Sequence, residues 1–251
     1  MAFIPYIKAS LRKNVYTLDD KYVINDGKTH PFAILLPGGG YSVVYSYGEG
    51  DPIAKKLNEN GISAFILYYG VKKKARYPKP IDDCARAIRY IIDNKDKYNV
   101  DINNYSLWGA SAGGHLAACM GTNTLGCINY NLPRPNCLIL IYPVVTLGKY
   151  AHKGSKHKFL GFFPTVEEIE KGSVQMHIDN EYPATYIWCG DSDKSVNPIN
   201  AKILKDSLDE KNVKNKLDIF PGIGHGVGLA TGTVAEPWFN NALNFWLKGG
   251  E

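Results

Sequence analysis

The sequence lacks any long hydrophobic run. Nowhere does it approach the ~20 consecutive apolar residues that a membrane-spanning helix needs. Residues 1–10 also contain no apolar segment of the signal-peptide type. We therefore expect a cytoplasmic protein that does not associate with a membrane.

Cysteine is scarce, and its spacing is not that of a disulfide-rich or zinc-binding protein. The chain has five cysteines, an odd number, and none lies in a C-x-x-C pair. No two histidines have the helical spacing of metal ligands, and no carboxylate–histidine cluster indicates zinc. The sequence thus predicts free thiols in a reducing compartment, and neither a metal nor another cofactor. The five residues are Cys84, Cys119, Cys127, Cys137 and Cys189.

Strong charge patterning is absent too. Charged residues make up 21% of the chain, and the net charge of +5 is spread along it. The densest basic stretches, 72–74 and 153–158, do not alternate with stacking aromatic residues as nucleic-acid-binding modules do. The G-x-x-x-x-G-K-[S/T] and G-x-G-x-x-G patterns of phosphate-binding loops are missing as well. We expect no nucleic-acid partner and no phosphate-binding loop.

The sequence does contain an alternation of strand and helix patterns. Its 251 residues, 45% of them hydrophobic, are enough for a substantial core without disulfides or metal. We expect one domain over residues 1–251. Its first 30 residues are expected to form two short antiparallel strands, Val15-Tyr16-Thr17 and Lys21-Tyr22-Val23-Ile24, separated by Asp19-Asp20.

This alternation predicts a doubly wound α/β fold with a mostly parallel sheet of about eight strands. In such sheets the functional site lies beyond the carboxyl ends of the strands. One helix is expected to begin with Asn197 as N-cap and Pro198 in its first turn. Residues 146–183 are too many for an ordinary loop and are predicted to form a small lid with one short helix near 166–171. Strand patterns cover 32–36, 63–69, 105–108, 137–142, 185–189 and 217–220, and helix patterns cover 52–60, 81–95, 114–120 and 235–247.

The most informative motif is Gly109-Ala110-Ser111-Ala112-Gly113, a G-x-S-x-G sequence between a strand pattern and a helix pattern. This is the pattern of a nucleophile elbow, in which small residues flank the serine because the strained turn presses them against neighbouring backbone. The helix behind the serine places N–H groups where negative charge can develop. The alternative is a glycine-rich turn whose serine has no catalytic role.

A nucleophilic serine needs a base and an acid, which in this type of sheet follow later strands in the order acid, then histidine. His225 follows the last strand pattern in a glycine-rich loop, where packing does not demand an imidazole. The preceding strand leaves two candidate acids. Asp193 lies further along the turn and can reach toward His225, whereas Asp191 could instead hydrogen-bond the turn backbone. We favour Asp193. His115, one turn into the helix after Ser111, is expected to be a packing or supporting residue.

Three consecutive glycines, Gly38-Gly39-Gly40, follow the first buried strand pattern. They let the backbone approach a substrate and direct N–H groups inward. A donor from this loop and the N–H of Ala112, the residue after the serine, together predict an oxyanion hole. Tyr41, directly after the glycines, is a candidate to line the substrate pocket.

Together these segments resemble the α/β-hydrolase fold. More narrowly, they resemble the serine esterases of the acetyl-esterase and acetylxylan/feruloyl-esterase-like branch, which also includes some formamidases. The resemblance implies Ser111 as nucleophile, His225 as base and Asp193 as acid, and the D-x-x-V placement of Asp193 before Val196 supports that acid. It also implies oxyanion donors from Gly39, Gly40 and Ala112. The segments that carry it are 36–41, 76–80 with Asp82, 108–116, 142–144, 152–155, 193–198 and 224–226.

One departure from the family concerns position 37. Many relatives have a histidine there that supports the glycine loop, whereas this chain has Pro37. The resemblance then implies an oxyanion hole with a different support. Family substrates are usually short acyl esters, often acetyl groups on sugars. Xylanase or sugar-hydrolase labels in this branch do not denote glycosidase chemistry, and the sequence shows no paired carboxylates of the kind that glycoside hydrolysis needs.

The leading hypothesis is a cofactor-independent serine esterase, monomeric or homodimeric, that hydrolyses small acyl esters, with acetylated carbohydrates among the candidate substrates. One alternative is an amidase, peptidase or formamidase that uses the same triad. The other is a non-catalytic, ligand-binding member of the fold. His152 and Ser155 could contact the substrate or cap the lid.

Overall fold

Seven strands form one sheet in the computed structural model, which describes residues 16–248. Strand β1 pairs antiparallel with β3, and all the other neighbours are parallel, in the order β1-β3-β2-β4-β5-β6-β7. The mostly parallel, doubly wound sheet is as predicted, although the described chain has seven strands where about eight were expected. The strands are β1 (Thr17–Tyr22), β2 (His30–Leu36), β3 (Ser63–Tyr68), β4 (Val100–Ala110), β5 (Cys137–Ile141), β6 (Ala184–Gly190) and β7 (Asn215–Phe220).

The prediction of two N-terminal strands was wrong. A single strand, β1, runs through Asp19-Asp20, the pair expected to separate them. The prediction failed because both acidic side chains find partners in the folded chain. The buried Asp19 forms an ion pair of 3.3 Å with Lys21, and Asp20 accepts a hydrogen bond of 3.1 Å from the Tyr98 hydroxyl. Val15, the first residue of the other expected strand, lies outside the described residues.

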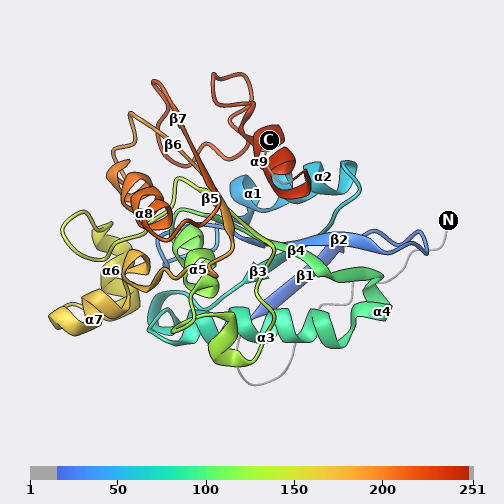
Figure 1. The fold of residues 1–251 in the computed structure, drawn as a ribbon, viewed down its shortest axis with the longest axis horizontal. Helices are drawn as coiled ribbons and strands as arrows, with labels where there is room; N and C mark the ends of the chain where they lie inside the picture. The colour runs from blue at the N-terminus through green and yellow to red at the C-terminus, as the bar shows by residue number, and fades with distance from the viewer. Residues whose placement is uncertain (1–15, 249–251) are drawn as a thin grey trace.

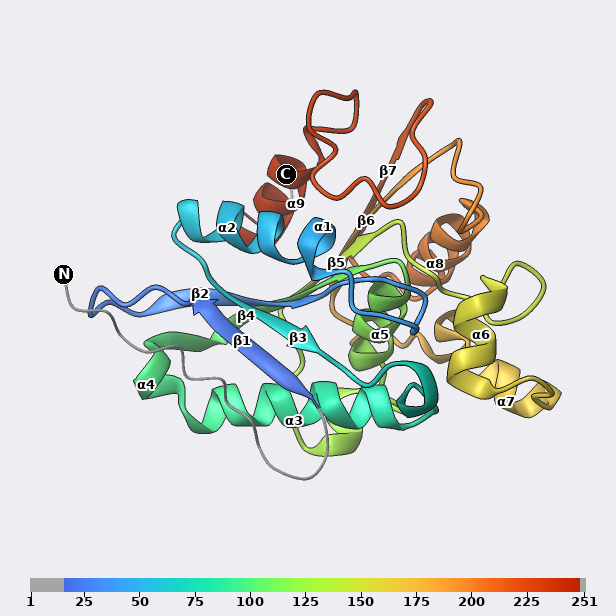
Figure 2. The same cartoon turned by 180° about the vertical axis from the view of Figure 1, so that it is seen from behind.

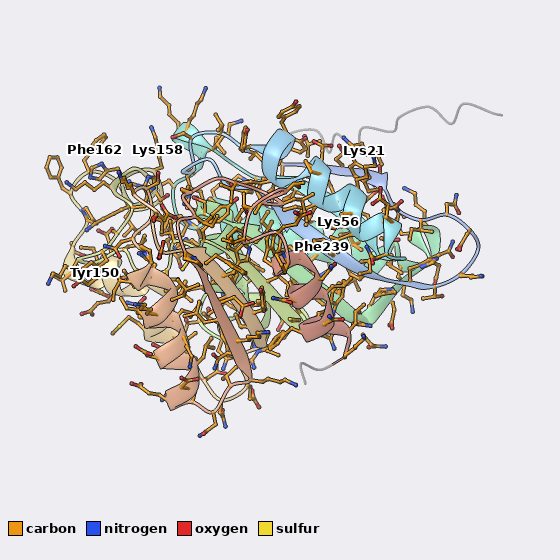
Figure 3. All side chains as sticks on the ribbon, turned by 90° about the horizontal axis from the view of Figure 1, so that it is seen from above. Lys21, Lys56, Tyr150, Lys158, Phe162 and Phe239 are labelled. Atoms are coloured by element: carbon orange, nitrogen blue, oxygen red, sulfur yellow. The ribbon has the colours of Figure 1, made fainter. Side chains whose placement is uncertain are left out.

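Helices cover both faces of the sheet (Figures 1 and 2). Helices α2 (Asp51–Glu59) and α9 (Trp238–Leu247) lie on one face, and α3 (Lys79–Asp93) and α5 (Ala112–Gly121) lie on the other. Lys56 of α2 lies 4.7 Å from the ring centre of Phe239 of α9 and so links the two helices on the first face (Figure 3). The remaining helices are α1 (Ser46–Glu49), α4 (Lys95–Tyr98), α6 (Lys153–Leu160), α7 (Val166–Lys171) and α8 (Ile199–Glu210), with 3-10 turns at Lys72–Lys74, Cys127–Tyr130 and Val174–His177.

The predicted helix boundaries need small corrections. Helix α9 begins at Trp238 rather than at 235, and its N-cap is Pro237. Helix α8 begins one residue later than expected: Pro198 is the N-cap, and the side chain of Asn197 accepts the N–H of Ile199 at 3.0 Å. Since both prolines lack an N–H, each can lie where the helix has no acceptor to offer.

Residues 146–183, predicted as a lid, connect β5 to β6. The short helix expected near 166–171 is α7, which begins at the predicted N-terminus because Thr165 and Glu168 form a capping box. The prediction missed α6, in which only three side chains are buried and which therefore has no clear amphipathic pattern. Figures 1 and 2 show α6 and α7 together at one end of the molecule.

Within residues 16–248, no helix has the length and apolar character needed to cross a bilayer. The same residues hold no group of three or more His, Cys, Asp or Glu side chains that could bind a metal ion. All five cysteines are free and buried.

Candidate active site

Ser111 lies in a sharp turn between β4 and α5. Its backbone has φ 54° and ψ −118°, a conformation that costs free energy in a residue with a side chain. Hydrogen bonds hold the turn on both sides: the Ser111 N–H donates to Ile141 (2.9 Å), and its carbonyl accepts from Val144 (3.1 Å). A Cβ at Gly113 would lie only 1.8 Å from the Leu36 carbonyl oxygen, which explains why this turn requires glycine.

The side chains of Ser111, His225 and Asp193 form one hydrogen-bonded series. His225 Nε2 lies 2.8 Å from Ser111 Oγ, and His225 Nδ1 lies 2.6 Å from Asp193 Oδ2. Because the carboxylate can only accept, Nδ1 carries the ring proton and Nε2 presents a lone pair to the serine hydroxyl. The three residues follow β4, β6 and β7, so the parallel sheet brings them together at its carboxyl edge.

The structure separates the two candidate acids. Asp193 faces His225 with its side chain fully buried, and its second oxygen accepts the N–H groups of Ser195 (2.8 Å) and Val196 (2.9 Å). Asp191 instead accepts the N–H of Gly222 at 2.7 Å and is exposed. Asp193 is therefore the acid that contacts the imidazole, and Asp191 holds the turn backbone.

The glycine loop lies beside the serine. Gly39 and Gly40 have φ values of +120° and +63°, and the N–H groups of Gly39, Gly40 and Ala112 donate to no other group within residues 16–248. Free N–H groups at these positions are what an oxyanion hole requires. A cavity of about 400 Å³ opens here, lined by Gly39, Gly40, Ser42, Val43, Tyr45, Glu49, Ser111, His152, Gly154, Ser195, His225 and Gly226.

The prediction that Tyr41 lines the substrate pocket was wrong. Its side chain is fully buried, and its hydroxyl lies 2.8 Å from His115 Nδ1. Its ring packs against Phe159 in the core because the left-handed turn at Gly40 and Tyr41 directs the side chain inward. His115 is the supporting residue that we expected: its Nε2 contacts the carbonyl of Gly172 at 2.8 Å, and burial lowers its pKa to about 4.

Sequence reasoning missed Glu49, a buried carboxylate in the cavity lining. Glu49 Oε2 accepts the N–H of Gly38 (2.7 Å), and Oε1 accepts the hydroxyl of Tyr142 (2.8 Å). Burial raises the pKa of Glu49, and the two hydrogen bonds from Tyr142 and Gly38 oppose that rise. No periodic pattern surrounds Glu49, so nothing local marks it. Tyr142 belongs to one of the segments that carry the family resemblance.

His152 caps α6 and also lines the cavity, whereas Ser155 is fully buried and does not line it. His152 Nδ1 accepts the N–H of Ser155 (3.2 Å) and lies 2.8 Å from its hydroxyl. Burial lowers the pKa of His152, and the nearby His225 lowers it further. Because His152 lines the cavity, its capping role does not prevent contact with a substrate.

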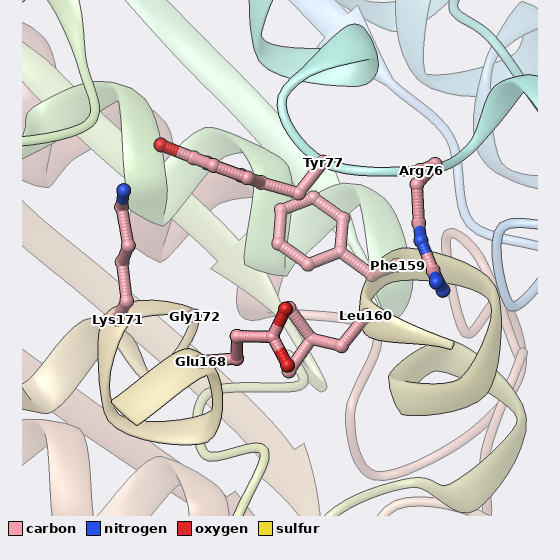
Figure 4. A pocket seen from close by; sticks show the side chains of 7 residues that line it. All are labelled: Arg76, Tyr77, Phe159, Leu160, Glu168, Lys171 and Gly172. Carbon is pink, nitrogen blue, oxygen red and sulfur yellow. The ribbon is translucent and has the colours of Figure 1, made fainter. Parts of the chain in front are cut away.

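A second cavity, of about 160 Å³, lies between the segment before α3 and helices α6 and α7 (Figure 4). It is lined by Arg76, Tyr77, Phe159, Leu160, Glu168, Lys171 and Gly172. None of the residues predicted from the sequence to form the site is among them.

Comparison with known proteins identifies a family and several relatives. The BD-FAE family model matches residues 20–208. Endo-1,4-beta-xylanase B of Butyrivibrio fibrisolvens is 31% identical over 86% of this chain and 35% of that protein. The acetylxylan esterase of Xylanibacter ruminicola is 30% identical over 85% of this chain and 44% of that protein. The chain thus spans less than half the length of either relative.

Solved structures give the same result. The acetyl ester-xyloside bifunctional hydrolase of Caldicellulosiruptor lactoaceticus superposes with a TM-score of 0.86 at 33% identity, covering 94% of this chain and 88% of the other. The carboxylesterase Cest-2923 of Lactobacillus plantarum has a TM-score of 0.75 at 23% identity over 94% of this chain and 92% of the other, and so speaks for the fold alone. These matches confirm the α/β-hydrolase fold and the esterase branch predicted from the sequence.

Proposed function

The chain belongs to the BD-FAE family of α/β-hydrolase esterases, and we propose that it is a serine carboxylesterase for small acyl esters. The observation that carries the proposal is the continuous path of two hydrogen bonds, 2.8 and 2.6 Å, from Ser111 through His225 to Asp193 at the edge of a cavity. A hydroxyl, an imidazole and a buried carboxylate in this order are the apparatus of nucleophilic acyl transfer.

In the proposed reaction, Ser111 Oγ attacks the acyl carbon while His225 Nε2 takes the hydroxyl proton. The imidazolium then gives this proton to the leaving alcohol, and the acyl group remains on Ser111. Water attacks the acyl-enzyme with His225 again as base, which releases the acid and restores the serine. Asp193 keeps the ring in the required tautomer and stabilises its charged form through the 2.6 Å contact.

The oxyanion would be bound by the N–H groups of Gly39, Gly40 and Ala112. All three are unpaired in the described chain, and Gly39 and Gly40 line the cavity that Ser111 faces. Fixed donors of this kind stabilise the tetrahedral intermediate without reorganising during the reaction.

We further propose acetyl esters, including those of carbohydrates, as substrates. In support, one relative is named an acetylxylan esterase, and the similar structure from Caldicellulosiruptor lactoaceticus is named an acetyl ester-xyloside hydrolase. The xylanase name of the Butyrivibrio relative does not suit this site, because within residues 16–248 Glu49 is the one carboxylate in the lining of the cavity, whereas glycoside hydrolysis needs two. A cytoplasmic location stays a prediction.

The test is hydrolysis of a short p-nitrophenyl ester by Ser111→Ala. We expect kcat/KM to fall by about 10³-fold or more with the fold intact, because the nucleophile is gone while the oxyanion donors remain. Asp191→Asn, which changes the acid that does not face His225, serves as the control and should retain activity. An unchanged rate in Ser111→Ala would remove the serine from the mechanism.

A second measurement separates the esterase from its alternatives. A panel of p-nitrophenyl esters of increasing acyl length, compared with the matching anilides, should show faster hydrolysis of acetyl esters than of longer esters or amides. Faster hydrolysis of the amide would favour an amidase. Binding without turnover, with no labelling of Ser111 by an organophosphate, would favour a non-catalytic protein.

A further inference from the structure

Glu49 is a buried carboxylate in the wall of the candidate active site, and the mechanism proposed above assigns it no role. Only 4% of the residue is exposed, yet it lines the same cavity as Ser111 and His225. It lies in α1, a four-residue helix after the glycine loop. Since an ionised side chain is costly to bury, a carboxylate at this position calls for an explanation.

The directions of the hydrogen bonds identify the charge state of Glu49. The Gly228 N–H can only donate, and it donates to the Tyr142 hydroxyl oxygen at 3.1 Å. The Tyr142 hydroxyl proton is then directed to Glu49 Oε1, and it has no other acceptor among residues 16–248. The second oxygen accepts the N–H of Gly38. Both carboxyl oxygens act as acceptors, which is the pattern of an ionised glutamate.

The contact between Glu49 and Gly38 holds the glycine loop in place. Because Glu49 holds the Gly38 N–H, that group cannot reach a substrate, and the free donors are those of the next two residues, Gly39 and Gly40. The loop is further held by the Tyr69 hydroxyl, which donates to the Pro37 carbonyl at 2.6 Å. Glu49 and Tyr69 thus hold the loop at Gly38 and Pro37, directly before the two residues with free donors.

The contact between Glu49 and Tyr142 supports the histidine loop, the segment that carries His225 and Gly228. The Tyr142 ring centre lies 4.7 Å from that of His225, and the Tyr142 hydroxyl ties down Gly228, three residues further along. Gly228 also packs closely on α1: a Cβ there would lie 2.4 Å from the Gly48 carbonyl oxygen. Glu49 therefore connects, through Tyr142, the loop that carries the base to the loop that carries the oxyanion donors.

We propose that Glu49 is an ionised positioning residue that clamps the oxyanion loop to the histidine loop and adds a second negative charge beside the imidazole of His225. This inference rests on the proposed esterase function. The titratable groups facing His225 are Asp193, Tyr142, His152 and Glu49, and Tyr69 faces Glu49 as well. Of these, Asp193 and Glu49 carry the negative charges that favour the imidazolium during the reaction.

The test compares Glu49→Gln with the wild type on a short p-nitrophenyl ester. Glutamine keeps the shape but loses the charge and one acceptor. We expect kcat to fall about 10-fold or more with KM changed less than about 3-fold, because the clamp acts on the transition state rather than on substrate binding. The acid limb of the pH–rate profile should move about 0.5 unit to lower pH, since the imidazolium loses a negative neighbour.

Three further variants sharpen the test. Glu49→Asp retains the charge and should restore the acid limb to its wild-type position, even if kcat recovers only in part. Tyr142→Phe breaks the link to Gly228 but leaves the charge, so kcat should fall while the acid limb stays in place. Glu59→Gln makes the same chemical change at an exposed glutamate of α2. It should leave kcat and the position of the acid limb unchanged.

The outcomes separate this inference from the function on which it rests. Wild-type kcat and an unmoved acid limb in Glu49→Gln would overturn the role of Glu49, even if the wild type hydrolyses esters. A fall in kcat that tracks loss of folded protein by circular dichroism, with the acid limb in place, would reduce Glu49 to a structural residue and also overturn it. A wild type that hydrolyses no ester would instead refute the proposed function.

Discussion

At the scale of single residues, burial acts in opposite directions on two side chains near the serine turn. It raises the pKa of Glu49 and lowers the pKa of His115 to about 4, because in both cases a low-dielectric surrounding disfavours the charged form. The His115 ring is therefore neutral, and it lies in hydrogen-bond contact with the Tyr41 hydroxyl and the Gly172 carbonyl. It should therefore affect stability in acid rather than catalysis.

The stability of the protein should fall in mild acid because of His115. In the unfolded chain its pKa is near the ordinary 6.5, and in the folded protein it is about 4. Between these pH values the unfolded chain binds the extra proton, so the free energy of unfolding decreases as pH falls. This one group should cost about 2 kcal/mol between pH 7 and pH 5.

Urea unfolding of the wild type and of His115→Gln at both pH values measures this cost. The variant should be less stable at pH 7, because the hydrogen bonds to Tyr41 and Gly172 fit it less well. Its loss of stability on acidification should nevertheless be smaller by about 2 kcal/mol. Equal losses in the two proteins would show that His115 is not the group responsible.

At the scale of elements, the unit formed by β4, the serine turn and α5 is fitted to the end of β2 by backbone contact. Gly113 in the first turn of α5 approaches the Leu36 carbonyl, and a Cβ at Gly109 would lie 2.3 Å from the Gly113 carbonyl oxygen. No flexible side chain can move aside at these points, so the fit tolerates no added atom. Helix α5 is itself fully buried, which leaves it no freedom to shift.

Gly113→Ala should therefore destabilise the protein by about 3 kcal/mol or more, since the new methyl group overlaps main-chain atoms. Chemical denaturation gives the value directly. Gly224→Ala is the matched control: a Cβ there meets nothing within 4 Å, and the free energy of unfolding should stay within about 0.5 kcal/mol of wild type. A Gly113→Ala protein as stable as the control would contradict the described packing.

At the scale of the whole molecule, one continuous core holds side chains from β1 to β6, and Leu217 and Phe220 of β7 pack against it. It contains all five cysteines, which come from helices on one face, a 3-10 turn and two strands. Burial raises the pKa of Cys127 and of Cys189 to about 12, so both thiols stay protonated near neutral pH. The folded protein should behave as though it had no thiols.

Titration with Ellman's reagent at pH 8 tests this. The native protein should release no chromophore over minutes, and the protein in guanidinium chloride should release five equivalents, one for each cysteine. Lys73→Cys, at an exposed site in the 3-10 turn before α3, provides a positive control with one reactive thiol. A fast equivalent from the native wild type would mean that the core opens or that a thiol is accessible.

The local sequence determined the fold class and the residues that meet at the site. Apolar runs alternating with helix patterns are local signals, and so are the small residues around Ser111 and the glycines around His225. The order of the strands then brings Ser111, Asp193 and His225 to one edge, because the carboxyl ends of parallel strands share that edge. Chain order and local pattern were sufficient for Ser111 and His225. For the acid they left Asp191 beside the favoured Asp193, and the contacts in the structure separate the two.

Only the tertiary structure decided how the side chains between these positions are used. Tyr41 turns into the core and Glu49 turns into the cavity wall, although both follow the same glycine loop and neither has a pattern that reveals its direction. Likewise, the partners of Glu49 lie 11 and 93 residues away. Such contacts depend on distances between elements that are remote in the chain, and these distances are set when the sheet and its helices pack together.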